Sequence, residues 1–111
     1  MLRIVRDDKG PQVILIVEGR IVTEWADLLE EECLDLIRSG YRVVLDLSSV
    51  VFIDRQGIAV LRRLSGAGVE IRGCSALIAD MLEDEGLKVS RRKWDMNDRV
   101  VPWRGRKGDD A

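Results

Sequence analysis

The apolar residues of the chain follow two periods, one typical of buried strands and one typical of helices. Short β-branched and aliphatic runs at 13–17 and 43–47 are bounded by Gly, Pro or polar residues, which predicts two strands buried on both faces. We expect them to be neighbours in the middle of a sheet. A weaker alternation at 2–5, followed by Gly10 and Pro11, predicts an N-terminal strand that turns into the first buried one.

Between the strands, apolar residues recur at the three- and four-residue spacing of helices. Thr23, Asp54 and Ser75 are suitable N-cap residues for three helices. The helices should end near Ser39-Gly40, near Gly66 and Gly68, and at Gly86. The residues expected on the buried stripes are Trp25, Leu28, Leu29, Cys33, Leu36 and Ile37 in the first helix, Ile58, Leu61 and Leu64 in the second, and Ile78, Met81 and Leu82 in the third.

Two further short strands, at 69–72 and 87–89, complete the predicted order β-β-α-β-α-β-α-β. Each helix has one apolar stripe, so the helices should pack mainly on one face of a mixed central sheet. The expected fold class is therefore α/β, with a single domain at 1–90. We expect 91–103 to be a C-terminal extension packing on or near the domain, and 104–111 to be a flexible tail.

Composition excludes several kinds of site. The 111 residues contain no His, and Cys33 and Cys74 stand alone, so a zinc site or a Cys/His nucleophile is not expected. Gly66-Ala67-Gly68 precedes a strand rather than a helix, which argues against a phosphate-binding loop. The acidic triplets at 30–32 and 83–85 fan around helices and do not converge on a substrate. We therefore predict no catalysis, no metal and no cofactor.

Charge and hydropathy point to a cytoplasmic protein. The longest apolar run, 13–17, is far shorter than the ~20 residues of a membrane span, so direct membrane insertion is not expected. Acidic residues at 7 and 8 come too early for a signal peptide. The net charge is −2, and the basic stretch at 88–107 lacks a nucleic-acid-binding motif, so no nucleic-acid partner is expected.

The segment 43–61 carries the most specific pattern in the chain. Its strand ends in Asp46-Leu47, and a loop containing Ser48 and Ser49 leads to a hydrophobic pair, Asp54 and a helix that opens with Gly57. This pattern resembles the signature of STAS domains, the fold of bacterial anti-sigma factor antagonists. The resemblance covers about residues 2–90 and agrees with the order of elements derived above.

The resemblance implies a function, but one residue of this chain departs from the family pattern. In the family, the residue after this Asp is commonly a Ser or Thr that an anti-sigma factor kinase phosphorylates, and the unphosphorylated domain binds that kinase. Here the residue is Arg55, which cannot accept a phosphoryl group. We predict no phosphorylation there, with Ser48 or Ser49 as a weaker substitute site.

The family's partner-docking corner corresponds to the start of the second helix. Asp54 is sufficiently explained as a helix cap, and the basic residues can be ordinary solvated charges, so the docking role is an alternative to these interpretations. The candidate partner-binding residues are Asp54, Arg55, Gln56, Gly57, Ala59, Arg62 and Arg63.

Two functions remain open at this point. The first is a non-catalytic protein-binding regulatory module in signal transduction and transcription regulation, which binds an anti-sigma factor kinase or a related signalling protein. The alternative is an accessory STAS subunit of a membrane transporter for lipids or anions. A small-molecule enzyme is the weakest candidate. Trp103 either covers the sheet or is exposed for self-association, which leaves a homodimer open.

Overall fold

The computed structural model describes residues 2–90 and contains four strands and three helices. The elements are β1 (Leu2–Lys9), β2 (Gln12–Ile21), α1 (Thr23–Arg38), β3 (Arg42–Ile53), α2 (Arg55–Gly66), β4 (Glu70–Arg72) and α3 (Ala76–Asp84). The predicted extension at 91–103 and tail at 104–111 lie outside the described residues, as does Trp103.

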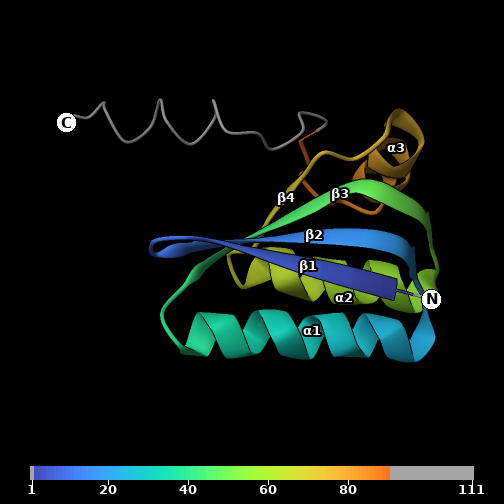
Figure 1. Ribbon diagram of the computed structural model, residues 1–111. Helices are drawn as coiled ribbons and strands as arrows, with labels where there is room; N and C mark the ends of the chain where they lie inside the picture. The colour runs from blue at the N-terminus through green and yellow to red at the C-terminus, as the bar shows by residue number, and fades with distance from the viewer. Residues whose placement is uncertain (1, 91–111) are drawn as a thin grey trace.

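The four strands form one mixed sheet in the order β1-β2-β3-β4. β1 and β2 form an antiparallel hairpin, whereas β2 pairs parallel with β3 and β3 pairs parallel with β4. The hairpin turns at Gly10, whose φ of +67° is a left-handed conformation that favours glycine. α1 and α2 lie side by side along one face of the sheet, and α3 lies beside the second half of β3 (Figure 1). The predicted single α/β domain with a mixed sheet is confirmed.

The core forms between the sheet and the helices. Alternate residues of the two central strands point to the helices, because successive side chains of a strand face opposite sides. The main contributors are Val13, Leu15 and Val17 of β2, Val43, Leu45 and Leu47 of β3, Leu29, Cys33 and Leu36 of α1, Val60, Leu61 and Leu64 of α2, and Ile78 and Leu82 of α3. Burial of this apolar surface is the main driving force for the fold. Ile58 and Met81, predicted to be inward, are only half-buried.

Three details of α1 differ from the prediction. The helix begins at Thr23 itself, and the N-cap residue is Val22, which makes no side-chain cap. Trp25 and Leu28, predicted on the buried stripe, are 37% and 43% exposed. The helix is rotated so that Ala26 lies on the stripe with Leu29, Cys33 and Leu36. Because a small alanine lets α1 approach the sheet closely, the larger Trp25 is left at the margin.

The predicted strand at 87–89 is not formed. Leu87 is buried, but the segment makes no ladder with β4. The Leu87 N–H donates to the Leu82 carbonyl at 3.1 Å. Just after the segment, the Ser90 N–H donates to the Ile71 carbonyl at 3.0 Å, and the Ser90 carbonyl accepts from the Cys74 N–H at 3.3 Å. β4 is only three residues long and the chain turns at Gly73, where φ is +74°, so little edge remains for another strand.

β3 is longer than predicted. It runs through Ser48 and Ser49, which were expected in a loop, and reaches Ile53. Pairing with β2 continues to the Ile21–Ile53 pair because the register shifts twice, after Ile16 and after Gly19. These irregularities let β2 and β3 end side by side.

Asp54 joins the starts of α1 and α2. Its Oδ1 accepts the N–H of Gly57 at 2.8 Å, which confirms the predicted cap of α2. Its Oδ2 accepts the N–H of Thr23 at 3.0 Å, so the same carboxylate also binds the first residue of α1. Ser75 caps α3 as predicted, with its Oγ accepting the N–H of Ile78 at 3.3 Å.

Gly57 allows α2 to start against the ends of β2 and β3. A Cβ at this position would lie 2.3 Å from the carbonyl oxygen of Ile21 and 2.7 Å from Cγ2 of Ile53. Gly66, at the other end of the same helix, has open space around its Cα. A methyl group added at Gly57 would therefore overlap neighbouring atoms, whereas one added at Gly66 would not.

We predict that Gly57→Ala lowers the unfolding free energy by more than about 2 kcal/mol, because the methyl group overlaps backbone that cannot move alone. Gly66→Ala is the matched control and should be neutral or stabilising by up to about 1 kcal/mol, through helix propensity. Urea unfolding followed by circular dichroism measures both. Similar stability of the two variants would contradict the close approach at Gly57.

We also predict that Asp54→Ala lowers the unfolding free energy by about 2 kcal/mol, because two backbone N–H groups lose their acceptor. Ser75→Ala removes one cap bond and should cost about 1 kcal/mol or less. Urea unfolding at neutral pH compares them. Equal losses in the two variants would mean that the Thr23 contact contributes nothing to stability.

Candidate functional site

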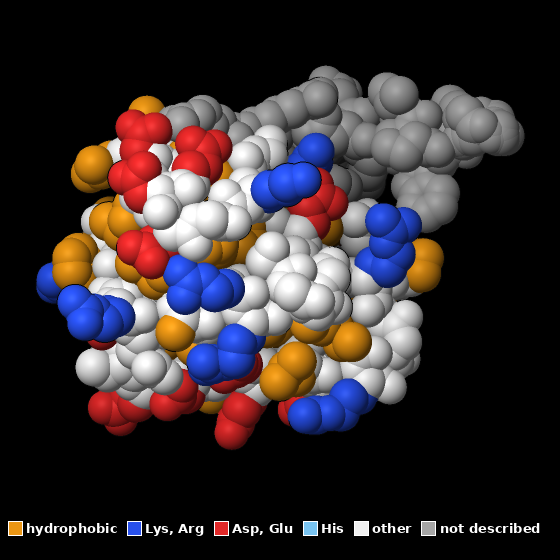
Figure 2. Space-filling view, turned by 180° about the vertical axis from the view of Figure 1, so that it is seen from behind, with side chains coloured by type: hydrophobic (Ala, Val, Ile, Leu, Met, Phe, Trp, Pro, Cys, Tyr) orange, Lys and Arg blue, Asp and Glu red, His pale blue; other side chains and the backbone are white. Residues whose placement is uncertain are grey.

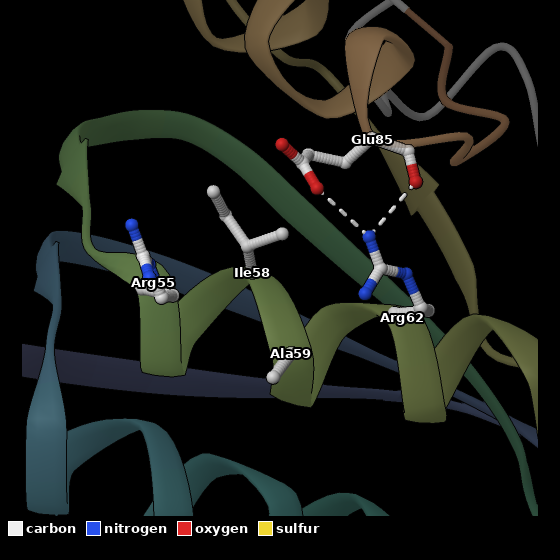
Figure 3. A pocket seen from close by; sticks show the side chains of 5 residues that line it. All are labelled: Arg55, Ile58, Ala59, Arg62 and Glu85. Atoms are coloured by element: carbon white, nitrogen blue, oxygen red, sulfur yellow. Dashed lines mark hydrogen bonds and ion pairs between the residues drawn. The ribbon is translucent and has the colours of Figure 1, made fainter.

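The outward face of α2 borders an open groove of about 550 Å³. Arg55, Ile58, Ala59 and Arg62 line it from α2, and Glu85, just after α3, lines it from the opposite side (Figure 3). Three of the predicted partner-binding residues, Arg55, Ala59 and Arg62, therefore come together here. The sequence analysis missed Glu85, because its place beside α2 depends on how α3 packs.

Arg62 connects the groove to the end of α3. Its Nη2 donates to the backbone carbonyl of Glu85 at 3.0 Å and to Oε1 of the same residue at 2.9 Å. Figure 3 shows the guanidinium pointing across to both acceptors. Both side chains are about half exposed, so water weakens this ion pair, which links α2 to the residue after α3.

Arg63 and Gln56 point towards α1 rather than into the groove. Arg63 makes a bidentate contact with Glu30, in which Nε donates to Oε2 at 2.7 Å and Nη2 donates to Oε1 at 3.0 Å. The hydrogen bond from Arg63 lowers the pKa of the Glu30 carboxyl below its ordinary value. Gln56 donates from Nε2 to Oδ1 of Asp27 at 2.8 Å. These predicted docking residues therefore join α1 to α2.

Asp54 and Gly57 support the corner from inside. Both carboxylate oxygens of Asp54 accept backbone N–H groups, and Gly57 is buried against the end of β2. Neither residue offers a free functional group to a partner. Their position fixes the direction of the first turn of α2, which carries Arg55.

Arg55 differs from the other basic residues of α2. It is the first residue of the helix and is exposed. Within residues 2–90 it makes no hydrogen bond or ion pair, whereas Arg62 and Arg63 are both held by carboxylates. The helix N-terminus carries a partial positive charge, so a cation there is electrostatically unfavourable. Fold stability therefore does not explain this residue.

Both kinds of charge are exposed around α2. Figure 2 shows Lys and Arg side chains across the middle of this face, with Asp and Glu side chains along the α1 margin and around α3. Apolar side chains are exposed between them. Along the chain, the corner is preceded by Val51 and Phe52, which are 72% and 42% exposed. A surface of this composition is suited to a protein partner.

The alternative modification sites lie in β3. Ser48 and Ser49 are exposed, but the Ser48 hydroxyl donates to Oδ1 of Asp46 at 2.7 Å. The Ser48 N–H donates to the same oxygen at 2.9 Å, which accounts for the burial of Asp46. The Ser48 side chain therefore stabilises the strand around a buried carboxylate.

The cysteines are placed for packing rather than chemistry. Cys33 and Cys74 are free and buried, as expected. Burial raises the pKa of the Cys33 thiol to about 12, which keeps it protonated and unreactive at neutral pH. Within residues 2–90, no group of three or more acidic or thiol side chains is arranged to hold a metal ion. None of the three described helices is long and apolar enough to cross a membrane.

Several solved structures have a fold similar to that of this chain. The chain is similar to an anti-sigma factor antagonist from Mycobacterium paratuberculosis, with 16% identity, a TM-score of 0.67 and coverage of 91% of this chain and 92% of that one. It is also similar to the phosphorylated form of the Bacillus cell fate determinant SpoIIAA, with 9% identity, a TM-score of 0.65 and coverage of 89% and 97%. At these identities the likeness shows a shared fold.

Longer proteins contain a similar region. The murine anion transporter Slc26a9 in its inward-facing state is 16% identical, with a TM-score of 0.57 over 70% of this chain and 14% of the transporter. Mglu is 30% identical, with a TM-score of 0.50 over 60% of this chain. The chain spans only 18% of the length of Mglu.

Most of the sequence matches a single family model. No curated protein matches the chain. The model of the STAS domain matches residues 3–87, which include every strand and helix described above except the first residue of β1. The resemblance found at the corner between β3 and α2 thus extends over the whole fold, and the chain belongs to the STAS domain family.

Proposed function

We propose that this STAS domain is a non-catalytic, protein-binding regulatory module, similar in role to anti-sigma factor antagonists. It docks its partner on the outer face of α2. The observation that carries the proposal is Arg55, an exposed cation at the helix N-terminus with no partner among the described residues. Such a charge opposes the helix dipole and is best explained by an acidic group on another molecule.

The neighbourhood of Arg55 supports a docking surface. Ile58 and Ala59 give the groove an apolar floor, and the Arg62–Glu85 pair closes its far end. Interfaces between proteins combine such apolar centres with charged margins. Val51 and Phe52 add exposed apolar surface just before the corner. The proposed partner is an anti-sigma factor kinase or a related signalling protein, and the proposed setting is transcription regulation in the bacterial cytoplasm.

The proposed module is not switched by phosphorylation at the usual site. SpoIIAA, which shares the fold, exists in a phosphorylated form. Here the helix start carries Arg55, and no Ser or Thr occurs between Asp54 and Leu64. A permanent positive charge replaces a group that phosphorylation would make negative. Binding would then be set by the amount of partner or by its state.

An accessory role in a membrane transporter is the second candidate. The similarity to the STAS-like region of Slc26a9 favours it, because that region belongs to an anion transporter. Both candidates use the domain to bind a protein, so they differ in the partner. Identification of the bound protein separates a signalling protein from a transporter subunit.

We predict that Arg55→Glu weakens partner binding at least about tenfold, because one charge in a complementary contact is reversed. Arg38→Glu is the matched control, since Arg38 is an exposed arginine in the last turn of α1 and pairs with Asp35 there. The immobilised domain captures the partner from lysate of the source cells, and calorimetric titration of the purified partner measures both variants. Equal affinities of Arg55→Glu and the parent protein would place the docking surface elsewhere.

We predict that the parent protein, incubated with ATP and its partner kinase, gains no phosphate on α2. Arg55→Ser restores a hydroxyl at the exposed first position of the helix and should be phosphorylated under the same conditions. Phosphopeptide mapping by mass spectrometry reads out both proteins. Phosphate on Ser48 or Ser49 of the parent protein would show a phosphorylation switch in another place.

A further inference from the structure

β1 forms a long, regular and open edge of the sheet. Its pairing with β2 is unbroken from Leu2–Gly19 to Lys9–Gln12, and it is the outermost strand of the sheet. Proteins commonly protect such edges with proline, a bulge, a very short strand or charged side chains. β1 has eight residues, no proline and no register shift, so its protection consists of its charged side chains, and only a strand with matching charges can pair with it. The described part of the chain therefore leaves this edge able to pair with another strand.

The side chains beneath this edge are incompletely covered. A groove of about 300 Å³ lies between β1 and α1, lined by Leu2, Ile4, Leu15 and Leu28 together with the charged residues Arg6 and Glu32. Leu28 is 43% exposed, and Trp25, one turn earlier on α1, is 37% exposed. A partly apolar groove next to an unpaired strand edge is a surface that association would bury.

The hairpin determines which backbone groups of β1 are available. Lys9 and Gln12 flank a two-residue turn and form the hydrogen-bonded closing pair of the hairpin. Hydrogen-bonded and non-hydrogen-bonded pairs alternate along an antiparallel ladder. The odd-numbered residues of β1 therefore bond to β2, and the even-numbered residues, from Leu2 to Asp8, direct their N–H and C=O groups outward.

The charges of β1 complement a second copy of the same strand. Arg3, Val5 and Asp7 lie on one face of the strand, with opposite charges placed symmetrically about Val5. Within one copy, Arg3 lies 3.6 Å from Glu18 and Asp7 lies 3.2 Å from Lys9, and these partly exposed pairs leave both charges able to interact with a second copy. In an antiparallel pair centred on Val5, Arg3 of each copy is opposite Asp7 of the other. A pair centred on Arg6 would instead place two Arg6 side chains opposite each other and Arg3 opposite Lys9. Of these two registers, the one centred on Val5 is therefore favoured.

We propose that the β1 edge is a homodimer interface, in which two β1 strands pair antiparallel around Val5 and join the two sheets into one. The outward backbone groups of the even-numbered residues supply the hydrogen bonds, and the grooves beside Leu28 are brought together beneath the joined strands. This surface shares no residue with the α2 groove, so a dimer can present two separate docking sites.

The register predicts one specific cross-link. Val5 would face Val5 of the second copy in a non-hydrogen-bonded pair, where Cα atoms lie about 4.5 Å apart, within the range of a disulfide. Val5→Cys should therefore form a covalent dimer on mild oxidation. Arg3→Cys is the matched control on the same face, and its two thiols would be more than about 10 Å apart. Cys33 and Cys74 are buried and do not compete.

The experiment measures the mass of the full chain by sedimentation velocity and the fraction cross-linked by non-reducing electrophoresis. We expect a dimer, rapid cross-linking of Val5→Cys and little of Arg3→Cys. Monomeric protein at the highest soluble concentration would overturn the proposal. A dimer in which Arg3→Cys cross-links as readily as Val5→Cys would also overturn it, because another register or surface would then be in use.

A charge exchange provides a second, independent readout. Arg3→Asp should raise the dimer dissociation constant about tenfold or more, because it places like charges opposite each other twice. Adding Asp7→Arg to the same chain exchanges the charges and should restore the dimer. Circular dichroism confirms that both variants are folded. Dissociation constants that do not change in Arg3→Asp would overturn the proposed register.

Discussion

The junction between α1 and α2 depends on one carboxylate that serves both helix starts. β2 and β3 end side by side at the Ile21–Ile53 pair, so α1 and α2 must begin next to each other, with the free N–H groups of both helices in a small space. Asp54 accepts one N–H from each, at Thr23 and at Gly57. Thr23 adopts a φ of +44°, which is unusual for a residue with a side chain, and its bond to Asp54 helps to hold that conformation.

This constraint explains how charges are used on α2. With the first turn fixed, Arg63 reaches Glu30 of α1 and Arg62 reaches Glu85 after α3, so two of the basic residues hold the helices together. Arg55 lies beyond both contacts and keeps its charge free of the described residues. The proposed docking role and structural support are thus divided among residues that look equivalent in the sequence. The proposed dimer interface at the β1 edge lies on another element.

Local chemistry could be predicted from the sequence, and contacts between elements could not. Asp54 was predicted as a cap because an acidic residue before a helical pattern satisfies nearby N–H groups, but its second bond, to Thr23, joins positions 31 residues apart. Trp25 was misplaced because periodicity gives the face of a helix without the distance at which it packs. The Arg63–Glu30 contact likewise depends on the packing of α1 against α2, which neither helix specifies alone.

Native-state hydrogen exchange, followed residue by residue by NMR, tests the double role of Asp54 most directly. In Asp54→Ala, the amides of Thr23 and Gly57 should both exchange much faster than in the parent protein, because both lose the same acceptor. The amide of Ile78, which is capped by Ser75, should be unaffected beyond the change in global stability. Faster exchange at Gly57 alone, with Thr23 unchanged, would contradict the account of one carboxylate holding two helix starts.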